Sequence, residues 1–353
     1  MNTTEYRMAL DSLRAILALL DKDASLSDIV QGRDAVLARY QPIFSTAEIK
    51  HLTQEQFKSF LLFENNRHWS GLNRKGPRAC QDIAALREAL ALLLDDSKPL
   101  DQRMSKVADE VPGMGKALIT AILLVSYPTK YGVWNNTSEA ALKTLKVWPP
   151  FDRGATFGAR YVAVNQTLLL LAKDLGIDLW TLDALFFRVA RPDGPVNPEP
   201  QPPIGPPGQE EAQRFGLERH LHEFLRDNWG KMPLGREWTI YAEQGDEEAG
   251  YEYPTDIGRI DLLAKHRTKP RWLVVELKRA QTSDETVGQV LRYIAWVRRH
   301  LAENAEVVEG LIICHEAEDT LRYAVSEIPN VSVQLYEVSF TLRPDPKSLR
   351  RRD

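Results

Sequence analysis

The chain has 353 residues, 43% of them hydrophobic, which is longer than an ordinary single domain and apolar enough to build more than one core. Its formal net charge of -4 excludes a globally basic nucleic-acid binder, so any contact with DNA has to come from local patches. With two cysteines, Cys80 and Cys314, it has neither a disulfide framework nor a cysteine-based zinc spacing. We therefore expect a reducing, cytoplasmic location.

Residues 1–190 place apolar side chains at spacings of three and four, as in EYRMALDSLRAILALL, DIAALREALALLL and NQTLLLLAKDLGIDLWTLDALFF. This period is typical of amphipathic helices, so the sequence predicts a mainly helical N-terminal domain. Its first residues are amphipathic rather than continuously apolar, and no stretch reaches the roughly 18 apolar residues that a membrane span needs. We expect no leader peptide and no membrane partner.

A proline-rich linker is expected at 191–210, because this segment holds 8 of the 21 prolines and almost no large apolar residue. After it, a helix at 217–228 precedes short β-rich runs at 237–242, 258–264, 271–278, 309–315 and 331–340, with a long helix at 284–302 among them. This alternation predicts a mixed sheet covered by helices over residues 211–342, followed by a basic tail at 343–353. The fold class is α + α/β.

Three ionisable residues interrupt two of the apolar runs. Asp261 lies within GRIDLLA, and Glu276 and Lys278 lie two apart in WLVVELKRA, so the latter two share one face of a strand. Charges inside apolar strands are costly unless they are paired or bind a metal. The alternative is that Glu276 and Lys278 form an edge-strand charge pair and that Asp261 is a solvated acid near a turn.

Phosphodiester hydrolysis would give each of these groups a task. Hard oxygen ligands suit Mg²⁺ or Mn²⁺, which neutralises the phosphate and lowers the pKa of an attacking water. Asp261 and Glu276 would hold the metal, and the backbone carbonyl of Leu277 could add a ligand. Lys278 would orient or deprotonate the water, or stabilise the charge that develops on the phosphorus centre.

GRIDLLA, VVELKR and the following GQVLRYIAWV resemble the nuclease domain of NucS-type endonucleases, within the PD-(D/E)-x-K superfamily and its restriction-endonuclease-like fold. Gln289 and Tyr293 resemble the Q-x-x-x-Y motif of the RecB-like branch. The resemblance implies that Gln289 hydrogen-bonds a site carboxylate or water and that Tyr293 contacts DNA, both from one helix face. From the residues alone, Tyr293 is equally well a core aromatic.

The same family places a glutamate on the helix before the sheet, which Glu218 matches first and Glu223 second. Glu218 is therefore a candidate catalytic residue by resemblance, with surface decoration as the alternative. Asp256, in YPTD, also matches the family pattern, as a loop residue before the strand rather than as a metal ligand.

In the N-terminal domain, VPGMGKALITA (111–121) resembles a helix-hairpin-helix element. Gly113 and Gly115 would allow a tight turn that presents backbone N–H groups to a DNA phosphate at a helix N-terminus, and Lys116 would add charge. An ordinary turn is the alternative. In DNA glycosylases that carry this hairpin the catalytic Asp follows 20 residues after the last glycine, where this chain has Asn135, and their lysine is replaced by Ala117. The resemblance therefore implies DNA binding, with Asn135 among the contacts, rather than glycosylase chemistry.

A second DNA-binding candidate is the segment FENNRHWSGLNRKGPR (63–78), in which basic and aromatic side chains alternate. Arg67 could contact phosphate and Trp69 could stack on a base. The alternative is a solvated loop with Trp69 in the core.

These observations predict a magnesium-dependent DNA endonuclease whose N-terminal domain selects the substrate, in restriction-type defence or in repair. The alternative is a non-catalytic DNA-binding module with a nuclease-like fold, which the intact set of Asp261, Glu276 and Lys278 disfavours. RNA is the alternative substrate. A homodimer is implied by the resemblance alone, because double-strand cutting in this class commonly uses two copies.

Overall fold

The computed structural model describes residues 2–74, 76–152, 154–190, 221–222, 224–278, 284–303 and 305–337. The expected linker at 191–210, the tail at 343–353, and Glu218 and Glu223 lie outside these residues. The described chain forms two compact units. The first combines the helical region with Trp238–Lys265, and the second contains the described residues of 207–237 and those from 266 onward.

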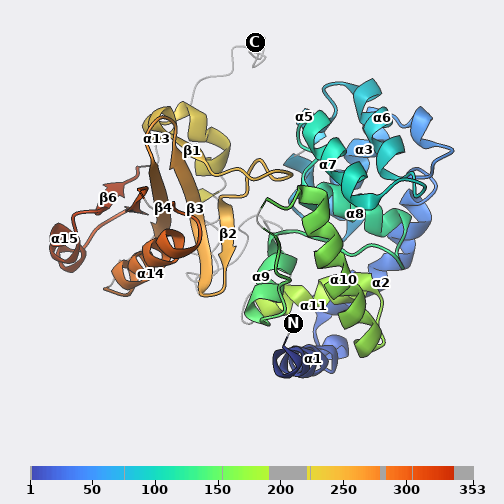
Figure 1. The fold of residues 1–353 in the computed structure, drawn as a ribbon, viewed down its shortest axis with the longest axis horizontal. Coiled ribbons are helices and arrows are strands. Elements are labelled where there is room, and N and C mark those ends of the chain that lie inside the picture. Colours follow the sequence, from blue (N-terminus) through green and yellow to red (C-terminus); the bar gives the residue numbers. More distant parts are fainter. Residues whose placement is uncertain are drawn as a thin grey trace, which may run out of the picture. The chain divides into compact units, whose positions relative to one another are not determined.

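The N-terminal region is helical, as predicted (Figure 1). Its α-helices are α1 (Thr3–Leu17), α2 (Ala24–Tyr40), α3 (Gln54–Leu61), α4 (Phe63–Asn66), α5 (Gly76–Ala79), α6 (Ile83–Leu93), α7 (Leu100–Glu110), α8 (Lys116–Ser126), α9 (Asn136–Thr144), α10 (Phe157–Leu175) and α11 (Leu179–Ala190). Short 3-10 helices are η1 (Leu20–Lys22), η2 (Ile49–His51) and η3 (Leu72–Arg74). None of the described helices is both long and apolar enough to cross a bilayer.

Local sequence signals account for many of these helix ends. Asp23, Asp82 and Thr156 precede α2, α6 and α10, and each side chain accepts a hydrogen bond from a backbone N–H of the first turn. At the other end of α10, Gly176 adopts a φ of 69°, a conformation that suits glycine at a helix C-terminus.

Helix α8 forms the centre of the helical core. Its sequence, KALITAILLVS, is apolar on all sides, and its residues from Leu118 to Val125 are buried. A helix without a polar face requires neighbours all around it. Close packing recurs between α7 and α10, where a Cβ on Gly158 would lie 1.8 Å from the carbonyl oxygen of Asp101.

The strands are β1 (Trp238–Ile240), β2 (Tyr251–Thr255), β3 (Gly258–His266), β4 (Arg271–Lys278), β5 (Val307–Cys314) and β6 (Val331–Leu335). They form a mixed sheet in the order β1-β3-β4-β5-β6, with β2 paired to β3. The pair β2 and β3 is antiparallel, whereas β4, β5 and β6 run parallel. Helical segments in this part of the chain are 221–222, 224–228, η4 (Trp229–Lys231), α13 (Pro233–Glu237), α14 (Asp284–His300) and α15 (Asp319–Ser326).

In the second unit, α14 packs against β4 and β5 (Figure 1). The contact is closest at Gly310 on β5, where an added Cβ would lie 2.5 Å from Cγ1 of Val290 and 2.9 Å from Cδ1 of Ile294. A side chain at position 310 would push the helix away from the sheet. The parallel strand β4, RWLVVELK, is buried along most of its length, as its nearly continuous apolar run indicates.

The mixed sheet flanked by helices agrees with the prediction, but several elements were not expected, among them strand β2 and helix α15. Strand β2 was not predicted because Pro254 lacks a backbone donor and Glu252 adopts a left-handed φ of 50°, so YEYPT does not show a regular strand pattern. Helix α15 is only eight residues long and was also missed. Asp256 lies in the turn between β2 and β3, as expected of a loop residue.

Candidate active site

Strand β4 carries the most unusual charged residue of the second unit. Glu276 is 1% exposed, among neighbours on the strand that are apolar and buried. A carboxylate in such a place has to be compensated by a cation or by hydrogen bonds. The ammonium nitrogen of Lys278 lies 2.9 Å from its Oε1 atom and supplies one such contact.

The pairing follows directly from strand geometry. Side chains two apart project from the same face of a strand, so Glu276 and Lys278 point the same way while Leu277 points to the other side. The side chain of Lys278 is 30% exposed, which means that its ammonium reaches the end of the buried strand with access to water. The charge pair therefore has one buried member and one member that solvent can reach.

Asp261 lies on β3, in the first unit. It is half-buried, and its neighbours Ile260 and Leu262 are fully buried. Ile260 and Leu262 pair with Tyr253 and Tyr251 of β2, which fixes the register of the strand around the acid. Strand alternation then turns Asp261 away from the face that Ile260 and Leu262 occupy.

Helix α14 carries the remaining pair named from the sequence. Gln289 is half-buried and Tyr293 is buried, and the spacing of four places both on one side of the helix. The ring of Tyr293 is packed in the interior of the second unit, so it would have to become exposed to contact DNA. That contact stays a prediction, and Glu218 and Glu223 fall outside the described residues.

The donor chemistry of these residues suits a hard divalent cation. Carboxylates and a backbone carbonyl are the oxygen ligands that Mg²⁺ and Mn²⁺ prefer. Among the residues that the structure describes, no group of three or more His, Cys, Asp or Glu side chains is arranged as a metal cluster.

Residues 240–327 match the family model of the endonuclease NucS C-terminal domain. The matched segment contains β3, β4 and α14, and with them every candidate catalytic residue that the structure describes. It is consistent with a NucS-type PD-(D/E)-x-K nuclease C-terminal domain. No curated protein and no solved structure matches the chain.

The candidate DNA-binding hairpin lies outside the NucS-type segment, between α7 and α8. Gly113 adopts a φ of 84°, which explains the need for glycine in this turn, and Gly115 is the N-cap of α8. The first N–H of the helix, that of Lys116, donates a hydrogen bond of 2.7 Å to the carbonyl oxygen of Gly245. The backbone group expected to bind phosphate therefore has an acceptor from the chain itself.

The side chain of Lys116 is also engaged. Its ammonium is buried and lies 3.0 Å from Oε2 of Glu139 and 3.2 Å from Oδ2 of Asp246. Burial alone would lower the pKa of Lys116, but these carboxylates outweigh burial and hold the pKa above its ordinary value. A direct contact of Lys116 with DNA stays a prediction, and it would require these ion pairs to open.

The other DNA-binding candidates occupy three different settings. Arg67 is exposed and holds a left-handed φ of 54° at the end of α4. Trp69 is packed in the core, where its indole N–H donates to Asp183 at 2.9 Å, so stacking on a base would require it to leave that packing. Asn135 is the N-cap of α9 and forms a capping box with Ser138.

Two buried carboxylates were not singled out from the sequence. Asp183 accepts from Trp69 and lies 3.2 Å from Nε2 of the buried His68, and burial raises its pKa to about 7. Burial also lowers the pKa of His68 to about 3. Glu139 binds Lys116 and Lys143, and only its spacing of four from Lys143 was visible in the sequence as a signal.

Proposed function

We propose that the protein is a metal-dependent endonuclease that hydrolyses phosphodiester bonds in DNA. The observation that carries the proposal is the buried carboxylate of Glu276 with the ammonium of Lys278 at 2.9 Å, in a segment that matches the NucS C-terminal domain. A buried acid beside a solvent-accessible lysine is a costly arrangement for stability alone. It is a useful one for binding a phosphate group and a water molecule.

Each residue has a role in this proposal. Asp261 and Glu276, with the carbonyl of Leu277, would hold Mg²⁺ or Mn²⁺, which supplies a Lewis acid for the phosphate and an acidified water. Lys278 would hold the attacking water by a hydrogen bond or take its proton, and its charge would stabilise the phosphate oxygens. Gln289 would orient a site carboxylate or water, and Glu218 is the further candidate by resemblance.

The domain division forms part of the same proposal. Residues 211–342 would carry the chemistry, residues 1–190 would select the DNA feature to be cut, and 191–210 would link them. Defence against foreign DNA and DNA repair both fit this arrangement. A cytoplasmic location and a homodimer remain predictions.

Cleavage of a labelled DNA panel with Mg²⁺ or Mn²⁺ tests the proposal, using plain duplex, single-stranded, mismatched, branched and base-modified substrates. The wild type is compared with Glu276→Gln and Lys278→Met, which keep most of the side-chain volume. We expect Lys278→Met to lose about 10²-fold or more in rate, the usual contribution of a positioned proton-transfer group. Glu276→Gln should lose activity as well, because it removes a carboxylate that would hold the metal.

Glu309→Gln is the matched control, because Glu309 is a β5 carboxylate in an ion pair with Arg271 and has no assigned role in the chemistry. Unfolding midpoints check that all variants are folded. If the wild type cuts and Glu276→Gln cuts equally well, the assigned site is wrong. If the wild type binds DNA but cuts nothing with either metal, the non-catalytic DNA-binding module replaces the nuclease.

A further inference from the structure

An acidic hairpin between β1 and β2 covers part of the helical region within the first unit. We define the acidic hairpin as residues 243–248, which read EQGDEE. Its tip is closed by two backbone hydrogen bonds of 2.9 Å between Glu243 and Asp246, and Gly245 adopts a φ of 78° in the turn. The tip is thus a defined structure that presents several carboxylates together.

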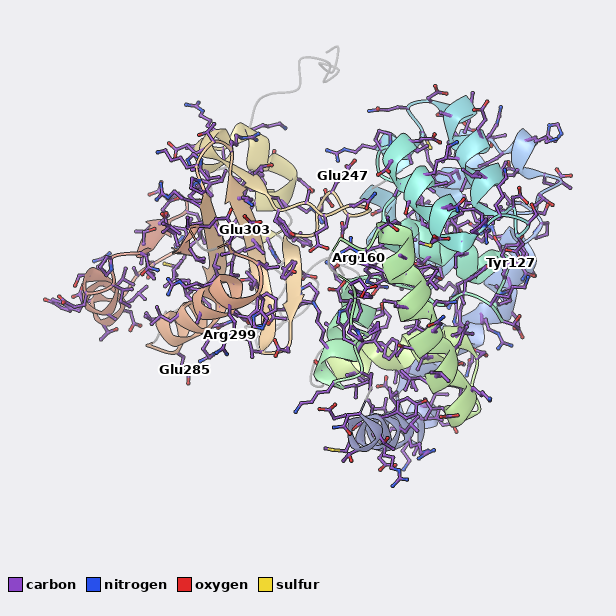
Figure 2. The ribbon with its side chains drawn as sticks, viewed as in Figure 1. Tyr127, Arg160, Glu247, Glu285, Arg299 and Glu303 are labelled. Atoms are coloured by element: carbon purple, nitrogen blue, oxygen red, sulfur yellow. The ribbon has the colours of Figure 1, made fainter. Side chains whose placement is uncertain are left out.

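Three cations from separate helices pair with this hairpin. Arg78 of α5 lies 2.7 Å from Oε2 of Glu247, and Arg160 of α10 lies 3.0 Å from Oε2 of Glu243. Arg160 and Glu247 are labelled in Figure 2. The third pair is Lys116 of α8 with Asp246, at 3.2 Å.

The hairpin also satisfies two helix N-termini. The N–H of Lys116 donates to the carbonyl oxygen of Gly245, and the N–H of Phe157, at the start of α10, donates to Oε1 of Gln244 at 3.1 Å. Free N–H groups at helix N-termini are favourable places for phosphate oxygens. Three cations and two helix N-termini of the helical region therefore contact the acidic hairpin.

The acidic hairpin approaches the start of α8 closely at Gly115, one of the two glycines of the candidate DNA-binding turn. A Cβ on Gly115 would lie 2.7 Å from the carbonyl oxygen of Gly245. The turn that was expected to present backbone N–H groups to a DNA phosphate thus lies against a backbone carbonyl of the hairpin.

We propose that the acidic hairpin is an internal substitute for DNA phosphates, and that DNA displaces its carboxylates from Arg78 and Arg160. The inference rests on the proposed function, because it takes DNA as the substrate. The surface around Arg78 and Arg160 is then a phosphate-binding edge of the helical region. In the absence of DNA, Glu247 and Glu243 occupy this edge.

The burial of the three ion pairs indicates which pairs DNA can displace and which pair stays closed. The side chains of Arg78 and Glu247 are 57% and 53% exposed, so their pair is solvated and exchanges readily. The pair of Arg160 and Glu243 is half-buried. Lys116 and Asp246 are largely shielded from water, and opening that pair would leave buried charge without compensation, so this contact anchors the hairpin.

The test measures DNA affinity of the full-length protein by fluorescence anisotropy, with a labelled duplex in EDTA so that cleavage cannot contribute. The variant is Glu243→Gln with Glu247→Gln. The control is Asp11→Asn with Glu88→Gln, which removes two exposed carboxylates from α1 and α6 and matches the change in net charge. We expect the hairpin variant to bind about 3- to 25-fold more tightly than the control, up to about fivefold for each of the two ion pairs removed.

Two further results are expected. The dependence of log Kd on log salt should become steeper by roughly one phosphate contact for each cation released. The gain from Glu247→Gln should disappear when Arg78→Gln is also present, because the freed guanidinium is then missing.

An affinity equal to that of the control, with no coupling between Arg78 and Glu247, would overturn the inference and leave the hairpin as a permanent structural contact. That result leaves the proposed function standing as long as the wild type binds DNA. If the wild type neither binds nor cuts DNA, the proposed function fails, and the inference fails with it.

Discussion

Replacing Glu139 with glutamine tests whether charge holds the centre of the first unit together. Oε2 of Glu139 accepts a hydrogen bond of 3.0 Å from Trp134 and lies 3.0 Å from the ammonium of Lys116, and Oε1 lies 2.8 Å from that of Lys143. Glutamine has nearly the same size and can still accept from the indole. The substitution therefore removes the negative charge while leaving the packing almost intact.

The expected magnitude follows from the pKa of this carboxyl. Burial alone would raise the pKa, but Lys116 and Lys143 outweigh it and lower the pKa from 4.5 to about 2. At about 1.36 kcal/mol for each unit of pKa, a decrease of this size corresponds to roughly 3 kcal/mol of folding free energy at neutral pH. Because the pKa is lower in the folded protein, this stability is present above pH 4.5 and is lost as the pH falls toward 2.

Urea unfolding followed by tryptophan fluorescence measures this effect, since Trp134 contacts the carboxylate. At pH 7 we expect Glu139→Gln to lose about 3 kcal/mol, and the difference from wild type should shrink between pH 4.5 and 2. Glu88→Gln, at an exposed position on α6, should match the wild type throughout. A Glu139→Gln deficit that stays constant across this pH range would show that shape rather than charge stabilises the site.

Further substitutions at Gly310, Asn135 and Asp183, with Gly288→Ala as a control, have expected outcomes. In urea titrations, Gly310→Ala should lower the free energy of unfolding by roughly 1–3 kcal/mol, because the added methyl group overpacks against α14. Gly288→Ala should raise the free energy of unfolding by about 0.5–1 kcal/mol, because the nearest neighbour of its Cβ would lie 3.7 Å away and alanine favours the helix. Asn135→Ala should cost about 1 kcal/mol by removing the cap of α9, and Asn135→Asp should retain that stability in the same assay. Burial raises the pKa of Asp183 to about 7. The contribution of this carboxyl group to folding stability is therefore fully present below pH 3.8 and is lost as the pH rises through 7. Thermal melts across this range should therefore show wild type losing stability relative to Asp183→Asn as the pH increases, and a constant difference would contradict the buried, neutral carboxyl.

Periodic patterns predicted most of the architecture, because the spacing of apolar residues along the chain reflects which face of a helix or strand is buried. The three-and-four spacing of residues 1–190 gave the helices, and the apolar run of β4 gave a buried strand with Glu276 and Lys278 on one face. Strand β2 could not be predicted in this way, because Pro254 and the left-handed Glu252 make its pattern irregular.

Lys116 shows why local motifs predict backbone conformation better than they predict surface chemistry. The glycines before it require a tight turn into α8, and the structure contains that turn. What the helix N-terminus binds depends on Gly245 and Asp246, about 130 positions further along the chain, and no spacing rule connects them to the turn. A phosphate-binding turn and a turn that binds its own acidic hairpin have the same local sequence requirements, because both need close approach of an acceptor to a free N–H group. The affinity change on neutralising Glu243 and Glu247 reports on the outer arginines, Arg78 and Arg160, because the contact of Lys116 with Asp246 stays closed as the anchor of the hairpin.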